Sequence, residues 1–160
     1  MSFPFLEPLP VETLLAHGVP APFVFGQADR VRFHELDVLD HVNNATYLTW
    51  FETFRVAYLK AYGISDYAQP GTRPGLVIRN IEIGYRAPLH LNDIYIVAGR
   101  SVSYRRTSWT MEYVVVAGGK VCAISRAVIV HMASDGVTKT PLPAAMIDAI
   151  TTRDGATRDA

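Results

Sequence analysis

The chain has 160 residues, of which 49% are hydrophobic, and its 15 basic and 15 acidic side chains give a formal net charge of zero. A chain of this length is most simply one domain with a substantial core, and zero net charge leaves no global field to attract nucleic acid or an anionic membrane. The single cysteine, Cys122, cannot form an intramolecular disulfide, and no apolar run reaches the roughly 20 residues of a membrane-spanning helix. We therefore expect a cytoplasmic protein that binds neither nucleic acid nor membranes.

The two ends of the chain differ in composition from its middle. Residues 1–25 are rich in proline, with one short helix expected at 11–17, whereas residues 151–160 are polar and are expected to fray because they have nothing to bury. We assign residues 1–25 to an N-terminal extension, 26–140 to the main domain and 141–160 to a C-terminal tail.

The main domain opens with an extended segment at 23–36, followed by a loop at 37–43. Residues 44–62, NATYLTWFETFRVAYLKAY, contain neither proline nor glycine, and large apolar side chains recur at helical spacing. This pattern predicts one helix of about five turns that ends before Gly63. Its apolar stripe is too wide for a helix that rests on a surface, so other elements must wrap around it.

Four strand patterns follow the helix, with turn-forming residues between them. They occupy residues 76–89, 93–105, 108–117 and 120–132. Consecutive strands joined by short turns are most easily antiparallel. The element order therefore predicts an α+β domain in which a four-strand meander curves around the helix, after a first strand that precedes it.

The segment DVLDHVNNATY, residues 37–47, places the Asp37 carboxylate just upstream of the predicted helix start. Asn43 and Asn44 suit a helix N-cap, where an Asn side chain accepts a hydrogen bond from a backbone N–H group. The remaining N–H groups and the positive end of the helix dipole favour developing negative charge. This arrangement suits the polarisation of, and attack on, a thioester carbonyl.

The longer segment FHELDVLDHVNNATYLTWFETFR, residues 33–55, resembles the signature of the 4-hydroxybenzoyl-CoA thioesterase branch of the hot-dog fold superfamily. The resemblance extends over roughly residues 26–140 and implies a curved antiparallel sheet of about five strands around one long central helix. It also implies an acyl-CoA thioesterase that releases a free carboxylic acid and coenzyme A without a cofactor. The superfamily commonly pairs two sheets edge to edge, so we expect a homodimer or a dimer of dimers.

The resemblance implies that Asp37 is the catalytic carboxylate, which either adds to the carbonyl carbon or activates the water molecule that does so. The backbone N–H of Asn44 would stabilise the oxyanion. Glu52 is the alternative carboxylate, because another branch of the superfamily has its catalytic acid inside the helix. From the residues alone, Asp37 also fits a loop aspartate that binds backbone N–H groups, and Glu52 fits an ion-pair partner of Arg55.

The candidate substrate-binding residues lie in the motif and in a later turn. They are His41, Asn43, Tyr47, Arg105 and Arg106. His41 could bind the substrate, orient the carboxylate or hold the loop. Arg105 and Arg106 resemble a basic run near the coenzyme A end of the site in this family, and we prefer this pair to Arg86 and Arg126 for binding phosphate. The histidines lack the spacing of metal ligands, so no metal site is expected.

Two other functions are compatible with these residues. A hot-dog protein could hold an acyl thioester of coenzyme A or of acyl carrier protein without cleaving it, and a related hydratase or dehydratase would act on an enoyl thioester through a paired histidine and aspartate. Release of a thiol identifies the hydrolase, and a change in enoyl absorbance identifies the hydratase. No motif specifies the acyl group.

Overall fold

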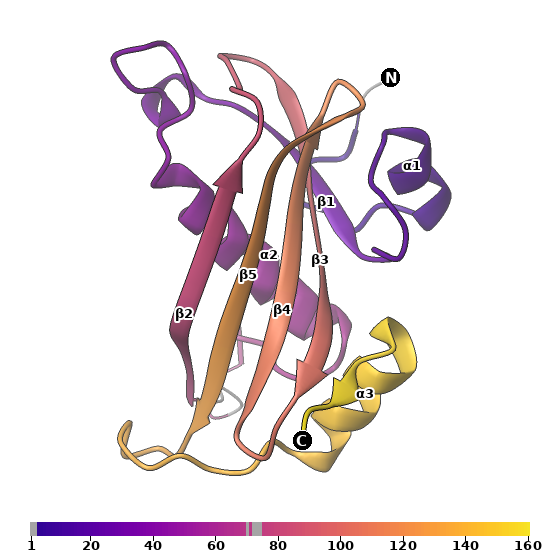
Figure 1. The fold of residues 1–160 in the computed structure, drawn as a ribbon, viewed down its shortest axis with the longest axis vertical. Helices are drawn as coiled ribbons and strands as arrows, with labels where there is room; N and C mark the ends of the chain where they lie inside the picture. The colour runs from indigo at the N-terminus through magenta and orange to yellow at the C-terminus, as the bar shows by residue number, and fades with distance from the viewer. Residues whose placement is uncertain (1–2, 70, 72–74) are drawn as a thin grey trace. The chain divides into compact units, whose positions relative to one another are not determined.

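The computed structural model describes residues 3–69, 71 and 75–160. Its elements form an α+β fold with a five-stranded antiparallel sheet and one central helix, as predicted (Figure 1). In chain order they are α1 (Val11–Ala16), β1 (Gly26–Arg30), a 3₁₀-helix (Phe33–Glu35), α2 (Thr46–Ala61), β2 (Gly75–Tyr85), β3 (Ile94–Tyr104), β4 (Ser108–Ala117), β5 (Lys120–Met132), α3 (Ala144–Asp154) and the short β6 (Thr157–Arg158). Among the described residues, no helix has the length and apolar character needed to cross a membrane.

The strands are arranged in the order β1-β3-β4-β5-β2, and β6 pairs with β3 outside this path. Strands β3, β4 and β5 are neighbours in both sequence and space, as expected, and the two-residue turn Gly118–Gly119 joins β4 to β5 with positive φ at both residues. The prediction of a four-strand meander was wrong for β2, which lies at the sheet edge beside β5. The connection after β2, residues 86–93, is longer than a tight hairpin turn, so it does not force β2 to pair with β3.

Two boundaries differ from the sequence-based expectation. The extended segment at 23–36 contains only the short strand Gly26–Arg30, and the chain then turns into the 3₁₀-helix Phe33–Glu35. The Glu35 side chain closes this turn by accepting a hydrogen bond from the backbone N–H of Arg32 at 2.7 Å. Helix α2 begins at Thr46, two residues later than Asn44.

The chain divides into two compact units, and helix α2 contributes its first half to one and its second half to the other. The first unit comprises the chain up to Phe54 with Ile83–Gly99 and Tyr113–Ser125, and the second comprises Arg55–Glu82, Arg100–Glu112 and Arg126–Ala160.

Within the first unit, the sheet is covered on both faces. On one face, Phe51 of α2 stacks on Tyr113 at 4.8 Å between ring centroids, and Phe54 packs so closely over Gly99 that an added Cβ would lie 2.6 Å from its ring. The opposite face is covered by the N-terminal segment, which includes the predicted short helix α1. The buried cluster on that face consists of Leu9, Leu14, Val19, Ala28, Ile96, Ala98, Val114 and Val116.

Within the second unit, the end of the chain is ordered, so the prediction that residues 151–160 fray was wrong. Helix α3 extends to Asp154 and buries Met146 and Ile150, and β6 then runs parallel to β3. Met146 and Ile150 are four residues apart and therefore share one face of the helix. The segment expected to fray begins at residue 151, inside α3, so the expectation divided the helix and left its apolar face unrecognised.

A buried carboxylate ties α3 to α2 and β3. Asp154, which is 8% exposed, accepts hydrogen bonds from the hydroxyls of Tyr58 and Tyr62, each at 2.5 Å, and from the backbone N–H of Ser101 at 2.6 Å. Burial raises the pKa of both tyrosines far above its ordinary value, and the neighbouring Asp154 raises each pKa further. Both phenols therefore remain neutral donors to the carboxylate.

We predict that Asp154→Asn lowers the free energy of unfolding by about 2–4 kcal/mol, because the amide nitrogen would face donors that are left unpaired in the interior. Urea unfolding measures this change. Asp148→Asn is the matched control on the exposed side of α3 and should change the free energy by no more than about 0.5 kcal/mol. Equal effects of the two substitutions would contradict the assignment.

Candidate functional site

The loop that carries Asp37 is closed by hydrogen bonds across its base. The N–H of Asp37 donates to the carbonyl of His41 at 2.8 Å, and the N–H of Asn43 donates to the carbonyl of Glu35 at 2.8 Å. Asp40 takes the left-handed conformation, with φ of 59°, which allows the chain to reverse between these contacts. The loop therefore brings the start of α2 back beside the end of the 3₁₀-helix.

The two oxygens of the half-buried Asp37 carboxylate have different surroundings. Oδ1 accepts hydrogen bonds from the backbone N–H groups of Leu39 at 2.8 Å and of His41 at 3.4 Å. Within the described part of the chain, Oδ2 accepts none. The loop-supporting interpretation of Asp37 is thus correct for one oxygen, while the other remains available for a ligand.

Asp37 faces a cavity of about 330 Å³ that lies within the first unit. The cavity brings together four of the predicted site residues, and its lining consists of Asp37, His41, Val42, Asn44, Tyr47, Tyr85, Arg86, Ala87 and Pro88. The sequence does not single out Tyr85, and among the arginines it favours Arg105 and Arg106 over Arg86. Tyr85 ends β2 and Arg86 follows it, far from the motif in sequence, so no local pattern indicates that they lie beside Asp37.

The two asparagines divide their roles at the start of α2. The side-chain oxygen of Asn43 accepts a hydrogen bond from the N–H of Ala45 at 2.9 Å. The backbone carbonyl of Asn43 accepts one from the N–H of Thr46, also at 2.9 Å. The carbonyl of Asn44 accepts a hydrogen bond from the Tyr85 hydroxyl at 2.8 Å, whereas no described residue accepts a hydrogen bond from the N–H of Asn44. Asn44 lines the cavity and directly precedes Ala45 and the first residue of the 16-residue helix α2, near the positive end of the helix dipole.

Tyr47 forms a wall of the cavity and is only 2% exposed. Its ring lies 4.9 Å from that of Trp50 and 5.2 Å from that of Tyr85, measured between centroids. Burial raises the pKa of Tyr47 to about 12, with smaller contributions from Cys122 and Tyr85. The phenol is therefore neutral near pH 7, where it can donate a hydrogen bond to a bound ligand.

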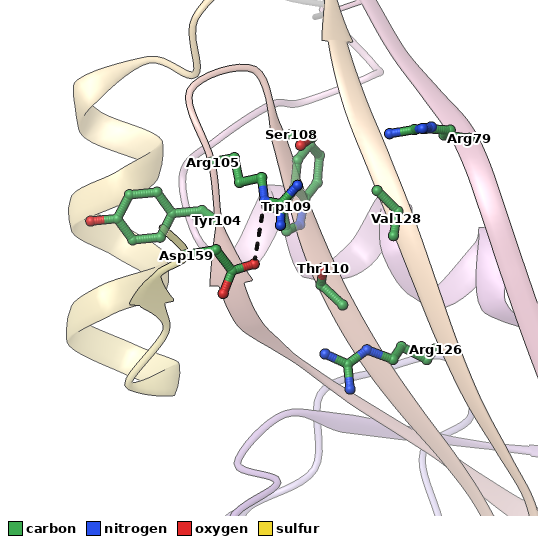
Figure 2. Close-up of a pocket in the computed structure, with 9 residues that line it drawn as sticks. All are labelled: Arg79, Tyr104, Arg105, Ser108, Trp109, Thr110, Arg126, Val128 and Asp159. Carbon is green, nitrogen blue, oxygen red and sulfur yellow. Dashed lines mark ion pairs between the residues drawn. The ribbon is translucent and has the colours of Figure 1, made fainter.

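The other predicted site residues do not line this cavity. Glu52 is exposed on α2, and Arg105 and Arg106 follow β3 in the second unit. There, Arg105 borders a cavity of about 260 Å³, together with Arg79 of β2 and Arg126 of β5 (Figure 2). The Nε atom of Arg105 lies 3.8 Å from a carboxylate oxygen of Asp159, which partly offsets the positive charge of this group.

The site also contains a pair of histidines. The rings of His41 and His90 meet edge to face, with 5.1 Å between centroids, and Nδ1 of His90 lies 3.7 Å from the Asp93 carboxylate. Across the residues that the structure describes, no group of three or more histidine, cysteine, aspartate or glutamate side chains is arranged to hold a metal ion.

The division of roles between the asparagines generates a stability prediction. Asn43→Ala should lower the free energy of unfolding by about 1 kcal/mol, because the N–H of Ala45 loses its acceptor at the helix start. Asn44→Ala is the matched control, since no described residue bonds to its side chain, and it should change stability by no more than about 0.5 kcal/mol. Chemical denaturation of the two variants in parallel tests the difference, and a larger loss for Asn44→Ala would refute it.

Comparisons with known proteins agree with this architecture. The model of the thioesterase-like superfamily matches residues 31–150. A solved thioesterase superfamily structure from Jannaschia sp. CCS1 is 40% identical, covers 96% of this chain and 97% of its own, and has a TM-score of 0.88. A thioesterase from Thermus thermophilus, solved in complex with coenzyme A and zinc, is 34% identical over 80% of this chain and 93% of its own, with a TM-score of 0.69.

A more distant structure, that of a predicted thioesterase from Bacillus stearothermophilus, has the same fold. It is 23% identical, covers 80% of this chain and 94% of its own, and has a TM-score of 0.71. The resemblance inferred from residues 33–55 and the expected hot-dog fold are therefore confirmed. The chain belongs to the thioesterase-like superfamily.

Proposed function

We propose that this protein is an acyl-CoA thioesterase, which hydrolyses a thioester to a free carboxylic acid and coenzyme A. The observation that carries this proposal is that one cavity is lined by both Asp37, whose Oδ2 accepts no hydrogen bond from a described residue, and Asn44, whose N–H has no described acceptor. Membership of the thioesterase-like superfamily supports the reaction class. The coenzyme A in the structure of the Thermus relative supports the identity of the carrier.

In the proposed reaction, the thioester oxygen binds at the N–H of Asn44, where the helix dipole favours the negative charge that develops during attack. Asp37 then acts by one of two routes. Its free oxygen adds to the carbonyl carbon and expels the thiolate, giving an anhydride that water hydrolyses, or it takes a proton from the water molecule that attacks. Both routes end with a carboxylic acid and the thiol of coenzyme A.

The remaining residues of the cavity suit substrate binding. Tyr47 is a neutral donor within reach of a ligand, and His41 offers a second polar group from the loop. Arg86 is exposed beside them, and no described residue forms an ion pair with it. An arginine at this position could bind a phosphate of the carrier, either coenzyme A or acyl carrier protein.

A second group of cations supports an anionic carrier. Arg105, with Arg79 and Arg126, borders the cavity of the second unit, and Arg106 is exposed in the same turn. Because the chain has no net charge, an anionic ligand must be held by such local groups. We propose that Arg105 and Arg106 contact the nucleotide phosphates of coenzyme A.

The sheet edge is consistent with a homodimer or a dimer of dimers, which we retain as a proposal. Strand β2 ends the strand order, and its Val77 and Ile78 are 45% and 39% exposed. A second copy of the chain would cover such an edge symmetrically.

Asp37→Asn should lower kcat by on the order of a hundredfold or more, because the amide neither accepts a proton readily nor adds to the carbonyl. The fold should persist, since the amide oxygen can still accept the bonds from Leu39 and His41. Thiol release from a panel of acyl-CoA substrates measures the change. Asp40→Asn is the matched control in the same loop and should retain activity within about twofold; wild-type turnover in the Asp37 variant would exclude the mechanism.

Replacing both Arg105 and Arg106 by alanine should raise KM for an acyl-CoA several-fold and leave KM for the corresponding acyl-pantetheine unchanged. Only the first substrate carries the nucleotide phosphates, so the truncated substrate is an internal control. Steady-state kinetics on both thioesters provide the measurement. Equal losses on the two substrates would reject phosphate binding by this pair.

A further inference from the structure

Glu35 is a buried acidic residue that the proposed chemistry does not use. It is 8% exposed and ends the 3₁₀-helix two residues before Asp37. Its side chain makes two short hydrogen bonds: Oε1 accepts from the indole N–H of Trp50 at 2.8 Å, and Oε2 accepts from the backbone N–H of Arg32 at 2.7 Å. The carboxylate therefore links helix α2 to the segment that leads into the loop at 37–43, which carries Asp37 and is here called the catalytic loop.

The backbone carbonyl of Glu35 makes the complementary connection. It accepts the N–H of Asn43 at 2.8 Å and receives a longer contact from the Thr46 hydroxyl at 3.4 Å. Asn43 directly precedes Asn44, whose N–H is the proposed oxyanion donor. Glu35 thus precedes the proposed base, Asp37, by two residues along the chain. It is also hydrogen-bonded to Asn43, the residue before the proposed donor, Asn44.

We propose that Glu35 is a positioning residue for the thioester site. Together, its carboxylate and carbonyl fix the catalytic loop against the first turns of α2, and so set the separation of the Asp37 carboxylate from the N–H of Asn44. This inference rests on the proposed function. It does not require Glu35 to touch the substrate, and Glu35 is not among the residues that line the Asp37 cavity.

The physical basis is that catalysis by a carboxylate and an oriented donor depends steeply on their relative placement. Glu35→Gln keeps the size of the side chain but offers one acceptor oxygen in place of two. Its NH₂ group must then face the N–H of either Trp50 or Arg32, so one of the two bonds is lost. The loop loses part of its support, while the groups that line the cavity remain unchanged.

The test measures acyl-CoA hydrolysis by Glu35→Gln and Trp50→Phe. Glu35→Gln should lower kcat at least about tenfold and change KM less than about twofold. Trp50→Phe removes the indole donor but leaves an aromatic ring against Tyr95, on which Trp50 stacks at 3.9 Å, and should lower kcat less. The double variant should be no slower than Glu35→Gln alone, because once the indole N–H is absent the amide oxygen can accept the remaining bond, from the backbone N–H of Arg32.

Asp29→Asn is the matched control. Asp29 is 5% exposed and binds the Arg32 guanidinium through both carboxylate oxygens at 2.9 Å, but it forms no described hydrogen bond or ion pair with the loop at 37–43 or with α2. Its substitution should cost stability while leaving kcat within about twofold. An equal loss of kcat in Asp29→Asn and Glu35→Gln would overturn the positioning role, because general destabilisation would then explain both.

Hydrogen exchange at the N–H of Asn43, followed by NMR, separates this proposal from the proposed function. Glu35→Gln should speed that exchange at least about tenfold and Asp29→Asn should not. If the wild-type protein releases thiol and Glu35→Gln has unchanged kcat, only the positioning role fails. If the wild-type protein releases no thiol from any acyl-CoA, the proposed function fails, and the positioning role of Glu35 in thioester hydrolysis fails with it. The exchange result then reports only whether Glu35 holds the loop.

Discussion

The need to keep the aromatic surface of α2 from water is the constraint on which the rest of the structure depends. In the first unit, Trp50, Phe51 and Phe54 are each less than 7% exposed, and rings of this size dominate the energetics of a core. A sheet that covers such a helix must approach it closely, and Gly99 provides the space that Phe54 requires. The packing of the helix therefore dictates the side-chain size on the strand that faces it.

Fixing α2 by its apolar side chains leaves its N-terminus free for chemistry. The first N–H groups of a helix have no acceptors within the helix. Here the loop before α2 satisfies some of them, while the N–H of Asn44, a residue that lines the cavity, has no described acceptor. The same loop carries Asp37, which lines the cavity; its Oδ1 supports the backbone, and its Oδ2 accepts no hydrogen bond from a described residue. Structural support and the proposed reactivity are thus combined in one short segment.

Charge in this protein is organised locally. The chain has no net charge, yet three arginines border one cavity in the second unit. The buried carboxylates accept hydrogen bonds from donors that lie on different helices and strands. Asp154 and Glu35 illustrate the rule that a buried charge is stable only when several hydrogen bonds replace its water. In each case these bonds connect α2 to a segment distant in sequence.

The sequence alone determined the features that depend on neighbouring residues: the long helix, the four later strands, and the grouping of Asp37, His41, Asn44 and Tyr47. These residues lie within one loop and helix start, so their spacing along the chain fixes their proximity. Tertiary structure decided the rest. The place of β2 beside β5, the delivery of Tyr85 and Arg86 to the cavity, and the anchoring of the C-terminal helix by Asp154 all depend on pairings between distant segments. Local propensity and periodicity carry no information about which distant segments pair, because those pairings are selected by the packing of the whole core.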